Sequence, residues 1–362
     1  MQRRCEDHKK LKMPPAVSVV IPCFNEAKHI ESCLESVLGF ESEFDFEVIV
    51  VEGMSTDGTR DILSRLAESH GNLRILDNPA RVVPVGMNMA IREAQGETIL
   101  RLDAHADYPP NYLTLCVETL RRTGAENVGG VVVTLPREDS IQARLVQAIT
   151  TSKMGVGNSA FRLGAKEGPV DTVPFGCFPR SLFDRIGLFD ERLVRHQDYE
   201  FNRRIHVSGG KVWLNPKIRV NYYNQPTIRG LYRQAAYSAK WDTWSWLVAP
   251  YAFTPRHGIP GVFVLSLFLS VVLSAVSKIF LVLAAVILIP YVILAILSAV
   301  KASRGNPWWT AFLLPPLYMG YHVAFGLGSL WGGLLLAFRF TPVQLVREPW
   351  PGAGRYRAWP PR

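Results

Sequence analysis

Carboxylates and other polar side chains gather in four short stretches of this sequence, residues 22–26, 52–57, 103–107 and 195–200. Oxygen-rich groups of this kind suit two kinds of chemistry. They can hold a hard divalent cation such as Mg²⁺ or Mn²⁺, which prefers oxygen ligands, and Mn²⁺ also tolerates imidazole. A single carboxylate can also take the proton of a hydroxyl group while that hydroxyl attacks a carbon. Either chemistry requires a fold that brings distant stretches together.

The pattern of the first 135 residues predicts elements that would do this. Short β-branched runs alternate with segments whose apolar residues recur at helical spacing, which is typical of an α/β fold with a mostly parallel sheet. Ligands of such sheets bind at the carboxyl ends of the strands, where three of the polar stretches fall. Strands are expected at 17–21, 46–51, 73–76, 98–102 and 128–134, and helices at 26–38, 59–68 and 85–94.

Beyond residue 135 the periodicity is less regular. Residues 150–180 are rich in glycine and proline and are expected to form a long loop beside the site, followed by helical pieces over 181–207. Residues 221–250 are crowded with aromatic side chains, three tryptophans among them. Such a density just before an apolar run predicts a helix that lies in the membrane interface.

The C-terminal part has the composition of a membrane anchor. Between residues 258 and 300 the one charged side chain is Lys278, which divides the run into predicted spans at 259–277 and 279–300. A third candidate, 310–337, contains two adjacent prolines and is flanked by basic residues on both sides. The positive-inside rule would keep both flanks in the cytosol, whereas one further complete span would separate them. The third segment is therefore re-entrant, broken at its prolines, or an exception to the rule.

The net charge of +9 and the pI near 9.4 agree with this interpretation, because basic residues gather on the cytoplasmic side of membrane proteins and attract anionic lipids. No nucleic-acid partner is needed to explain the charge. The N-terminal tail, residues 1–15, is basic and has no apolar stretch, so we expect no signal peptide and a cytoplasmic catalytic domain. Five scattered cysteines without a CxxC pair argue against a disulfide framework or a zinc site.

Four motifs in one order carry a specific resemblance. They are VSVVIPCFNE (17–26), VVEGMSTDGT (50–59), RLDAHAD (101–107) and QDYE (197–200). Together they resemble family 2 of the glycosyltransferases over about residues 17–245, which implies the GT-A fold, a Rossmann-like nucleotide-diphospho-sugar transferase domain. Three further stretches resemble bacterial succinoglycan-type exopolysaccharide glycosyltransferases: DTVPFG (171–176), GLFDERLVRHQ (187–197) and GGKVW (209–213).

The resemblance implies roles for the acidic stretches. Asp198 matches the catalytic base of the family. Asp103 matches the first aspartate of the family's DxD metal motif, and His105 stands where the second aspartate is usual, with Asp107 as the alternative ligand. The expected cofactor is Mn²⁺ or Mg²⁺, which would neutralise the diphosphate of a nucleotide sugar as the sugar leaves. The residues expected to contact the acceptor are Arg195, Gln197, Arg233 and Trp241.

Donor binding is expected around the ends of the first strands. The residues that match the family there are Pro22, Asn25, Glu26, Glu52, Asp57, Arg81, Asn88 and Asp103. Glu52 replaces the shorter aspartate that usually accepts hydrogen bonds from the base, so the donor contact is expected to be altered. Simpler interpretations stay open: Asn25 and Asp57 can cap a turn or helix, Arg81 can be a surface residue, and Arg233 can snorkel from an interfacial helix.

These residues predict one function and leave several competitors. We expect an inverting, metal-dependent transferase that moves a hexose, glucose or galactose, from a UDP-sugar to a polyprenyl-diphosphate-linked saccharide in exopolysaccharide synthesis at the bacterial inner membrane. The alternative acceptor is a polyprenyl phosphate that receives one sugar. A nucleotidyltransferase would need a glycine-rich phosphate loop after the first strand, where this chain has PCFNE. A scaffold with a decayed site would have no reason to keep Asp103 and Asp198.

The predicted organisation has five parts. In chain order they are a basic tail (1–15), a GT-A catalytic domain (16–220), an interfacial aromatic segment (221–257), a transmembrane region of two to three spans (258–338) and a second basic tail (339–362). The expected partners are a nucleotide-sugar donor, a lipid-linked saccharide acceptor and membrane lipids, with no nucleic acid.

Overall fold

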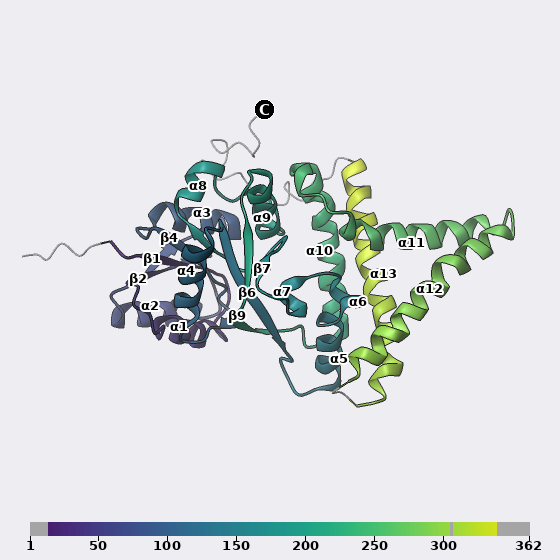
Figure 1. Ribbon diagram of the computed structural model, residues 1–362, viewed down its shortest axis with the longest axis horizontal. Helices are drawn as coiled ribbons and strands as arrows, with labels where there is room; N and C mark the ends of the chain where they lie inside the picture. Colours follow the sequence, from purple (N-terminus) through teal and green to yellow (C-terminus); the bar gives the residue numbers. More distant parts are fainter. Residues whose placement is uncertain (1–13, 305–306, 339–362) are drawn as a thin grey trace, which may run out of the picture.

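A computed structural model describes residues 14–304 and 307–338. An α/β domain is joined to a helical part, from which two helices project away from the sheet (Figure 1). The predicted basic tails, 1–15 and 339–362, lie almost entirely outside the described residues.

The predicted parallel strands are confirmed. Four of them pair in the order β3-β2-β1-β4, so the first half of the sheet is parallel. Their bounds are β1 (Val17–Cys23), β2 (Phe46–Glu52), β3 (Leu73–Asp77) and β4 (Thr98–Arg101). Strands β1, β2 and β4 are almost fully buried. Helices on both faces of a parallel sheet cause such burial, which explains the continuous apolar sequence of these strands.

The second half of the sheet is mixed, unlike the mostly parallel sheet that was expected. Strand β8 (Cys177–Pro179) runs antiparallel to both β4 and β6 (Asn127–Leu135). The long strand β9 (Val212–Tyr223) is parallel to β6 and continues past residue 220, the predicted end of the catalytic domain. Pro216 hides this strand in the sequence, because prolines are rare inside sheets. Two short strands pair antiparallel with β9, namely β5 (Ala106–Asp107) and β7 (Gly168–Pro169).

Helices cover both faces of the sheet and form two cores. The helices are α1 (Ile30–Leu38), α2 (Thr59–Ser69), α3 (Val83–Glu93), α4 (Tyr112–Thr123), α8 (Ser181–Ile186) and α9 (Gln197–Val207). Buried residues of α1, α2 and α4, such as Leu34, Leu63 and Leu113, fill one face. Those of α3, α8 and α9, such as Phe183 and Phe201, fill the other. Helix α9 starts at Gln197, which places Asp198 in its first turn.

The helical part is packed onto the α/β domain. Helices α5 (Ile141–Thr150), α10 (Ile228–Val248) and α13 (Thr310–Ala337) share a buried apolar cluster with α12 (Ile279–Ala302). Helix α13 is continuous through its two prolines, so the third apolar segment is not broken there. Glycines of α13 lie directly against α10, and a Cβ atom added at Gly328 would collide with the Ala236 carbonyl oxygen. Helix α10 therefore bridges the catalytic domain and α13.

Helices α11 (Pro255–Leu273) and α12 are long and apolar enough to cross a membrane, and they are the two such helices within the described part of the chain. Many of their apolar side chains are exposed, for example Phe268 and Leu297. They form a hairpin whose tip is the point farthest from the sheet (Figure 1). The segment predicted as a long loop contains two single-turn helices, α6 (Lys153–Val156) and α7 (Ala160–Leu163).

Candidate active site

The loops after β1 and β2 are joined by reciprocal hydrogen bonds. Asn25 has a φ of 53° and accepts a hydrogen bond from Thr56 N at 2.9 Å, while its own backbone N–H donates to Ser55 Oγ at 2.9 Å. Asp57 Oδ2 accepts from Ala27 N at 3.1 Å across the same two loops. Asn25 and Asp57 therefore stabilise the rim of the predicted donor crevice, in agreement with the capping interpretation.

Glu52 ends β2 next to the end of β1, which carries Pro22. Glu52 is buried and accepts hydrogen bonds from Ser55 N at 2.6 Å, Met54 N at 3.1 Å and Arg60 Nη1 at 3.0 Å. Burial alone would raise the pKa of Glu52, but these partners outweigh it and hold the pKa below its usual range. Glu52 is thus an ionised acceptor that shapes the turn, and a donor base would meet only its remaining lone pairs.

Arg101 lies between Asp103, the predicted metal ligand, and Asp198, the predicted catalytic base. Its Nη2 lies 2.7 Å from Asp103 Oδ1 and 3.6 Å from Asp198 Oδ2. Arg101 ends β4, is 5% exposed, and places its guanidinium 5.6 Å from the centre of the Phe175 ring. Sequence inspection missed this residue, although a single arginine at the end of an apolar strand, directly before Leu102-Asp103, is the signal that could have found it.

Asp198 combines burial with access to a cavity. Burial raises the pKa of Asp198 above its usual range; the charge of Arg101 opposes this shift and the charge of Asp103 adds to it. The Asp198 side chain is still 31% exposed. A carboxylate of this kind, once ionised, accepts a proton more readily than an ordinary aspartate, which suits a general base.

The side chains of the predicted metal ligands are not arranged around a common point where a metal ion could bind. His105 Nδ1 lies 3.0 Å from Glu26 Oε1, and this hydrogen bond raises the pKa of His105. Asp107, the alternative ligand, accepts a hydrogen bond from Ser32 at 2.9 Å. Across residues 14–304 and 307–338, no group of three His, Cys, Asp or Glu side chains is placed to hold a metal ion. Asp103 faces the cavity with one of its oxygens on Arg101.

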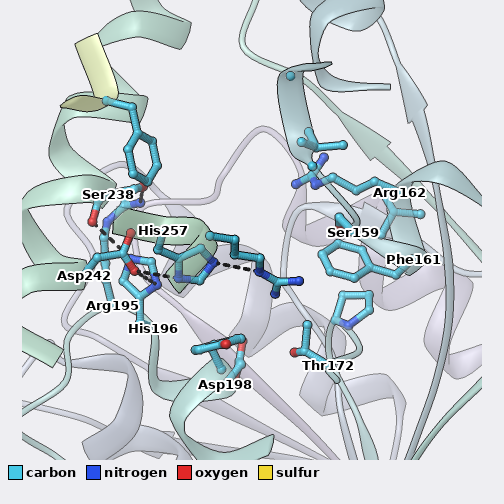
Figure 2. A pocket seen from close by; sticks show the side chains of 18 of the residues that line it. Ser159, Phe161, Arg162, Thr172, Arg195, His196, Asp198, Ser238, Asp242 and His257 are labelled. Atoms are coloured by element: carbon cyan, nitrogen blue, oxygen red, sulfur yellow. Dashed lines mark hydrogen bonds and ion pairs between the residues drawn. The ribbon is translucent and has the colours of Figure 1, made fainter. Parts of the chain in front are cut away.

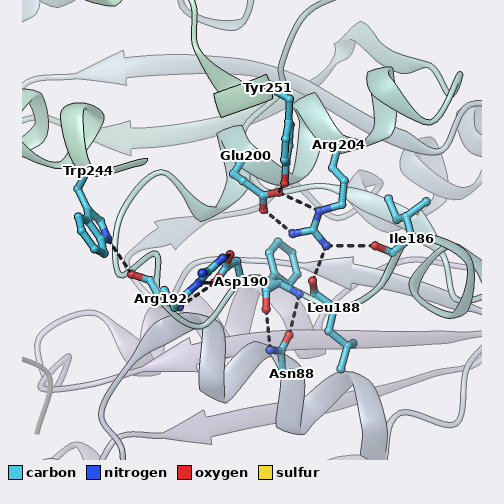
Figure 3. Close-up of polar contacts among 10 residues, drawn as sticks. Asn88, Ile186, Leu188, Asp190, Arg192, Glu200, Arg204, Trp244 and Tyr251 are labelled. Atoms are coloured by element: carbon cyan, nitrogen blue, oxygen red, sulfur yellow. Dashed lines mark hydrogen bonds and ion pairs between the residues drawn. The ribbon is translucent and has the colours of Figure 1, made fainter. Parts of the chain in front are cut away.

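A buried ion pair anchors the helix that carries Asp198 (Figure 3). Arg204 donates to Glu200 through Nη2 at 2.5 Å and Nε at 2.8 Å, and both side chains are buried. Arg204 also donates to Leu188 O at 2.6 Å, and the Tyr251 hydroxyl donates to Glu200. Tyr251 belongs to the short helix η1 (Pro250–Ala252) that follows α10. The network therefore fixes α9 to the chain that follows α8 and to η1.

A cavity of about 900 Å³ extends from Asp198 to the helical part. Its catalytic end is lined by Arg101, Asp103 and Asp198. Its other end is lined by Phe263 of α11, Tyr291 of α12, and Tyr321, His322 and Phe325 of α13. Of the residues expected to contact the acceptor, Arg195 and Gln197 line this cavity.

Other predicted binding residues lie elsewhere. Asn88 is fully buried, and its amide exchanges hydrogen bonds with the Phe189 backbone at 2.9 and 3.0 Å. Trp241 is buried in an apolar cluster. Arg233 and Arg81 are exposed and, like Asn88 and Trp241, are not among the residues that line the cavity. The fold thus brings Arg195 and Gln197 to Asp198 and does not bring these four there.

A second polar cluster in the cavity was not predicted (Figure 2). His196 directly precedes α9, and its Nδ1 lies 3.2 Å from Asp242 Oδ1 while its Nε2 lies 3.2 Å from Ser238 O. His257 of α11 approaches the same Asp242 oxygen at 3.5 Å. Burial lowers the pKa of His196 to about 4 and raises the pKa of Asp242 to about 8. Both shifts favour a neutral pair, with the proton on Asp242 at pH 7.

Comparison with known proteins finds similar sequences. Residues 18–187 match the family model described as glycosyl transferase family 2. The succinoglycan biosynthesis protein ExoA of Rhizobium meliloti (strain 1021) is 32% identical over 218 residues, which cover 60% of this chain and 66% of that protein. A Methanococcus voltae protein, dolichyl N-acetyl-alpha-D-glucosaminyl phosphate 3-beta-D-2,3-diacetamido-2,3-dideoxy-beta-D-glucuronosyltransferase, is 29% identical over 60% of this chain and 70% of its own length. The chain thus spans about two thirds of these relatives.

Among solved structures, a mannosyltransferase of Pyrobaculum calidifontis in complex with GDP-Man and Mn²⁺ is similar, with a TM-score of 0.56. The similarity covers 88% of each chain at 22% sequence identity. At this identity the likeness concerns the fold alone, and it confirms the GT-A fold that the four motifs implied.

Proposed function

The chain belongs to glycosyl transferase family 2, and we propose that it moves a hexose, glucose or galactose, from a UDP-sugar to a polyprenyl-diphosphate-linked saccharide in exopolysaccharide synthesis. The proposed reaction is a single displacement with inversion. A hydroxyl oxygen of the acceptor bonds to the anomeric carbon while the bond from that carbon to the diphosphate breaks. The hydroxyl proton passes to Asp198, and the nucleoside diphosphate leaves.

One observation carries the proposal: Asp103 and Asp198 meet at Arg101, at the end of a cavity that reaches α11, α12 and α13. Apart from Asp103, the residues expected to bind the donor do not line this cavity. A donor on the crevice side and an acceptor in the cavity would therefore meet between the two carboxylates. Such positioning accounts for much of the rate enhancement in group transfer.

A divalent cation is part of the proposal. Asp103 offers the hard oxygen ligand that Mn²⁺ or Mg²⁺ prefers, and the bound ion would stabilise the charge of the leaving diphosphate. His105 can contribute through Nε2, because its Nδ1 is occupied by Glu26. Since Asp103 Oδ1 pairs with Arg101, these residues fit an ion that is held jointly with the donor's diphosphate rather than by the protein alone.

The site of action is proposed to be the cytoplasmic face of the bacterial inner membrane. Two apolar helices suited to a membrane follow the catalytic domain. Two relatives are named for succinoglycan biosynthesis and for transfer to a dolichyl-linked sugar phosphate, which supports a lipid-linked acceptor here. A polyprenyl phosphate that receives one sugar is the alternative acceptor.

The test measures nucleoside diphosphate release by the full chain in detergent. UDP-glucose, UDP-galactose and GDP-mannose are each supplied with Mn²⁺, Mg²⁺ or a chelator, and with a polyprenyl phosphate or a polyprenyl-diphosphate saccharide. We expect one UDP-hexose to be consumed, only with metal and fastest with the diphosphate-linked saccharide. A faster reaction with the polyprenyl phosphate establishes the alternative acceptor instead.

Asp198→Asn provides the decisive comparison. Because the amide cannot take the proton, kcat should fall at least about 100-fold while the Kd of the donor stays within about twofold. The matched control is Asp184→Asn, which changes an exposed aspartate of α8 and should leave kcat unaltered. Full activity in the Asp198→Asn protein would exclude this mechanism.

A further inference from the structure

The cavity beside Asp198 has two chemically different ends. The catalytic end carries the charged side chains of Arg101, Asp103 and Asp198. The far end is made of aromatic and apolar side chains, including Phe263 of α11 and Phe325 of α13. A ligand that fills the whole cavity therefore has a polar part at Asp198 and an apolar part among the membrane helices.

Three further arginines line the cavity. Arg162 comes from α7, and its guanidinium lies 5.5 Å from the centre of the Tyr222 ring. Arg195 precedes α9 and donates to Ser238 Oγ at 3.3 Å. Arg256, in the first turn of α11, pairs with Asp171 Oδ2 at 2.6 Å. Figure 2 shows Arg162 and Arg195 on opposite sides of the cavity, with Asp198 at the bottom of the view.

The cavity contains more positive charge than its own carboxylates balance. The carboxylates among the lining residues are Asp103, Asp198 and Asp242. The first two share Arg101, and burial raises the pKa of Asp242 to about 8, so Asp242 carries a proton at pH 7. In the described part of the chain neither Arg162 nor Arg195 pairs with a carboxylate. Half-buried guanidinium groups without an anion favour a bound phosphate or carboxylate, which they bind through paired N–H groups.

We propose that Arg162, Arg195 and Arg256 form the subsite for the phosphate groups of an isoprenoid carrier, whose chain enters the cavity between α11, α12 and α13. This inference rests on the proposed function, because it places the carrier's phosphate beside the acceptor sugar. The acceptor hydroxyl must reach Asp198 while the lipid chain stays in the membrane. A phosphate between the two is required by that geometry in an isoprenoid carrier, whereas a phospholipid headgroup has no reason to approach the catalytic base.

The test measures binding without donor, so its result does not depend on turnover. Farnesyl diphosphate is titrated into the full chain in detergent, beside farnesol and phosphatidylglycerol at equal concentration. We expect farnesyl diphosphate to bind and to compete with the lipid-linked acceptor, and the other two not to compete. The double variant Arg162→Gln/Arg195→Gln should bind farnesyl diphosphate at least about 10-fold more weakly.

Steady-state kinetics distinguish loss of the phosphate subsite from a general loss of activity. In the double variant the KM of the lipid-linked acceptor should rise about 10-fold without a matching rise in the KM of the donor. Arg229→Gln, at an exposed position of α10 outside the cavity lining, serves as the matched control and should change neither. Unchanged farnesyl diphosphate binding in the double variant, or equal competition by phosphatidylglycerol, would overturn the subsite. Absence of sugar transfer with intact binding would instead refute the proposed function.

Discussion

Arg101 lies between the carboxylates of Asp103 and Asp198, and its charge opposes the rise in the Asp198 pKa that burial causes. Since Asp198 must be ionised to act as a base, activity should be lost as the pH falls through its pKa. Removal of the Arg101 charge raises that pKa further. The acid limb of kcat/KM is therefore expected at a higher pH in Arg101→Gln than in the wild type.

The measurement is a pH–rate profile of the wild type, Arg101→Gln and Arg101→Lys. Lysine keeps the positive charge, so its acid limb should stay close to that of the wild type even if its overall rate falls. Donor affinity, determined in parallel, reports whether the fold around Asp103 is intact. A limb that does not move in Arg101→Gln would show that this charge does not control Asp198.

A second prediction concerns the contribution of Asp242 to the stability of the folded protein at different pH values. The folded protein keeps the Asp242 proton up to about pH 8, whereas an ordinary aspartate loses it near 3.8, so this contribution to stability declines as the pH rises from 3.8 and is gone above about pH 8. His196 has the opposite effect, because its pKa is about 4 in the folded protein and 6.5 for an ordinary histidine. Between pH 4 and 6.5 its contribution to stability therefore rises with pH and cancels the decline caused by Asp242. Only from pH 6.5 to 8 should stability fall, by at most about 2 kcal/mol.

Asp242→Asn should remove this fall, because an amide resembles the protonated acid and does not titrate. The melting temperature of the detergent-solubilised protein is compared at pH 6.5 and 8, with Asp184→Asn as the control. The wild type and the control should both melt lower at pH 8. An equal drop in Asp242→Asn would assign the effect to other groups.

At the scale of elements, close packing of α13 on α10 depends on glycine. A Cβ atom at Gly328 would collide with the Ala236 carbonyl oxygen, which is backbone and cannot rotate away. On the same helix, a Cβ atom at Gly333 would meet nothing within 4 Å. Gly328→Ala should therefore lower the melting temperature by several degrees, whereas Gly333→Ala should not, since alanine favours helix. Equal behaviour of the two variants would mean that α10 and α13 are not packed this closely.

The sequence predicted the first half of the fold well for a physical reason. Strands β1, β2 and β4 are buried on both faces, so their apolar runs are continuous and easily recognised. In strand β9, Pro216 interrupts an alternation of buried and exposed residues that would otherwise indicate a strand. Helix α13 contains two prolines that local rules would treat as a break, yet packing against α10 keeps it continuous.

Some residues of the candidate site could likewise be predicted from the sequence, and others could not. Asp103 and Asp198 were predicted because each stands in a short motif of its own, and the fold then places both at Arg101. Asp242 and Arg162 have no such local context. Their importance depends on contacts with distant elements, His196 before α9 and Tyr222 of β9, which appear only when the chain is folded.

At the scale of the whole molecule, the first candidate span is fixed to the catalytic domain at its start. Arg256 pairs with Asp171, and the Tyr199 hydroxyl of α9 forms a hydrogen bond with Thr254, directly before α11. The position of Asp198 relative to the base of α11 is thereby constrained. A constrained distance of this kind suits an enzyme whose acceptor is held by its lipid chain, because the reacting hydroxyl then arrives at a set depth.

The α11–α12 hairpin yields a prediction about topology. At about 1.5 Å per residue, helices of 19 and 24 residues measure roughly 28 and 36 Å, enough to cross a hydrocarbon core of about 30 Å. Lys301 in the last turn of α12 and Arg304 just after it favour the cytoplasmic side, where the catalytic domain is proposed to lie. Val276 at the hairpin tip is 84% exposed and should then face the opposite side of the membrane.

Single cysteines test this in intact cells, on a Cys5→Ser background, because Cys23, Cys33, Cys116 and Cys177 are buried. A membrane-impermeant maleimide should label Val276→Cys directly, and Ser303→Cys only after permeabilisation. If both positions react only after permeabilisation, the hairpin dips into one leaflet without crossing. The carrier chain would then enter the cavity from within that leaflet. Direct labelling of Val276→Cys alone would instead give two spans with both ends on the side of the catalytic domain.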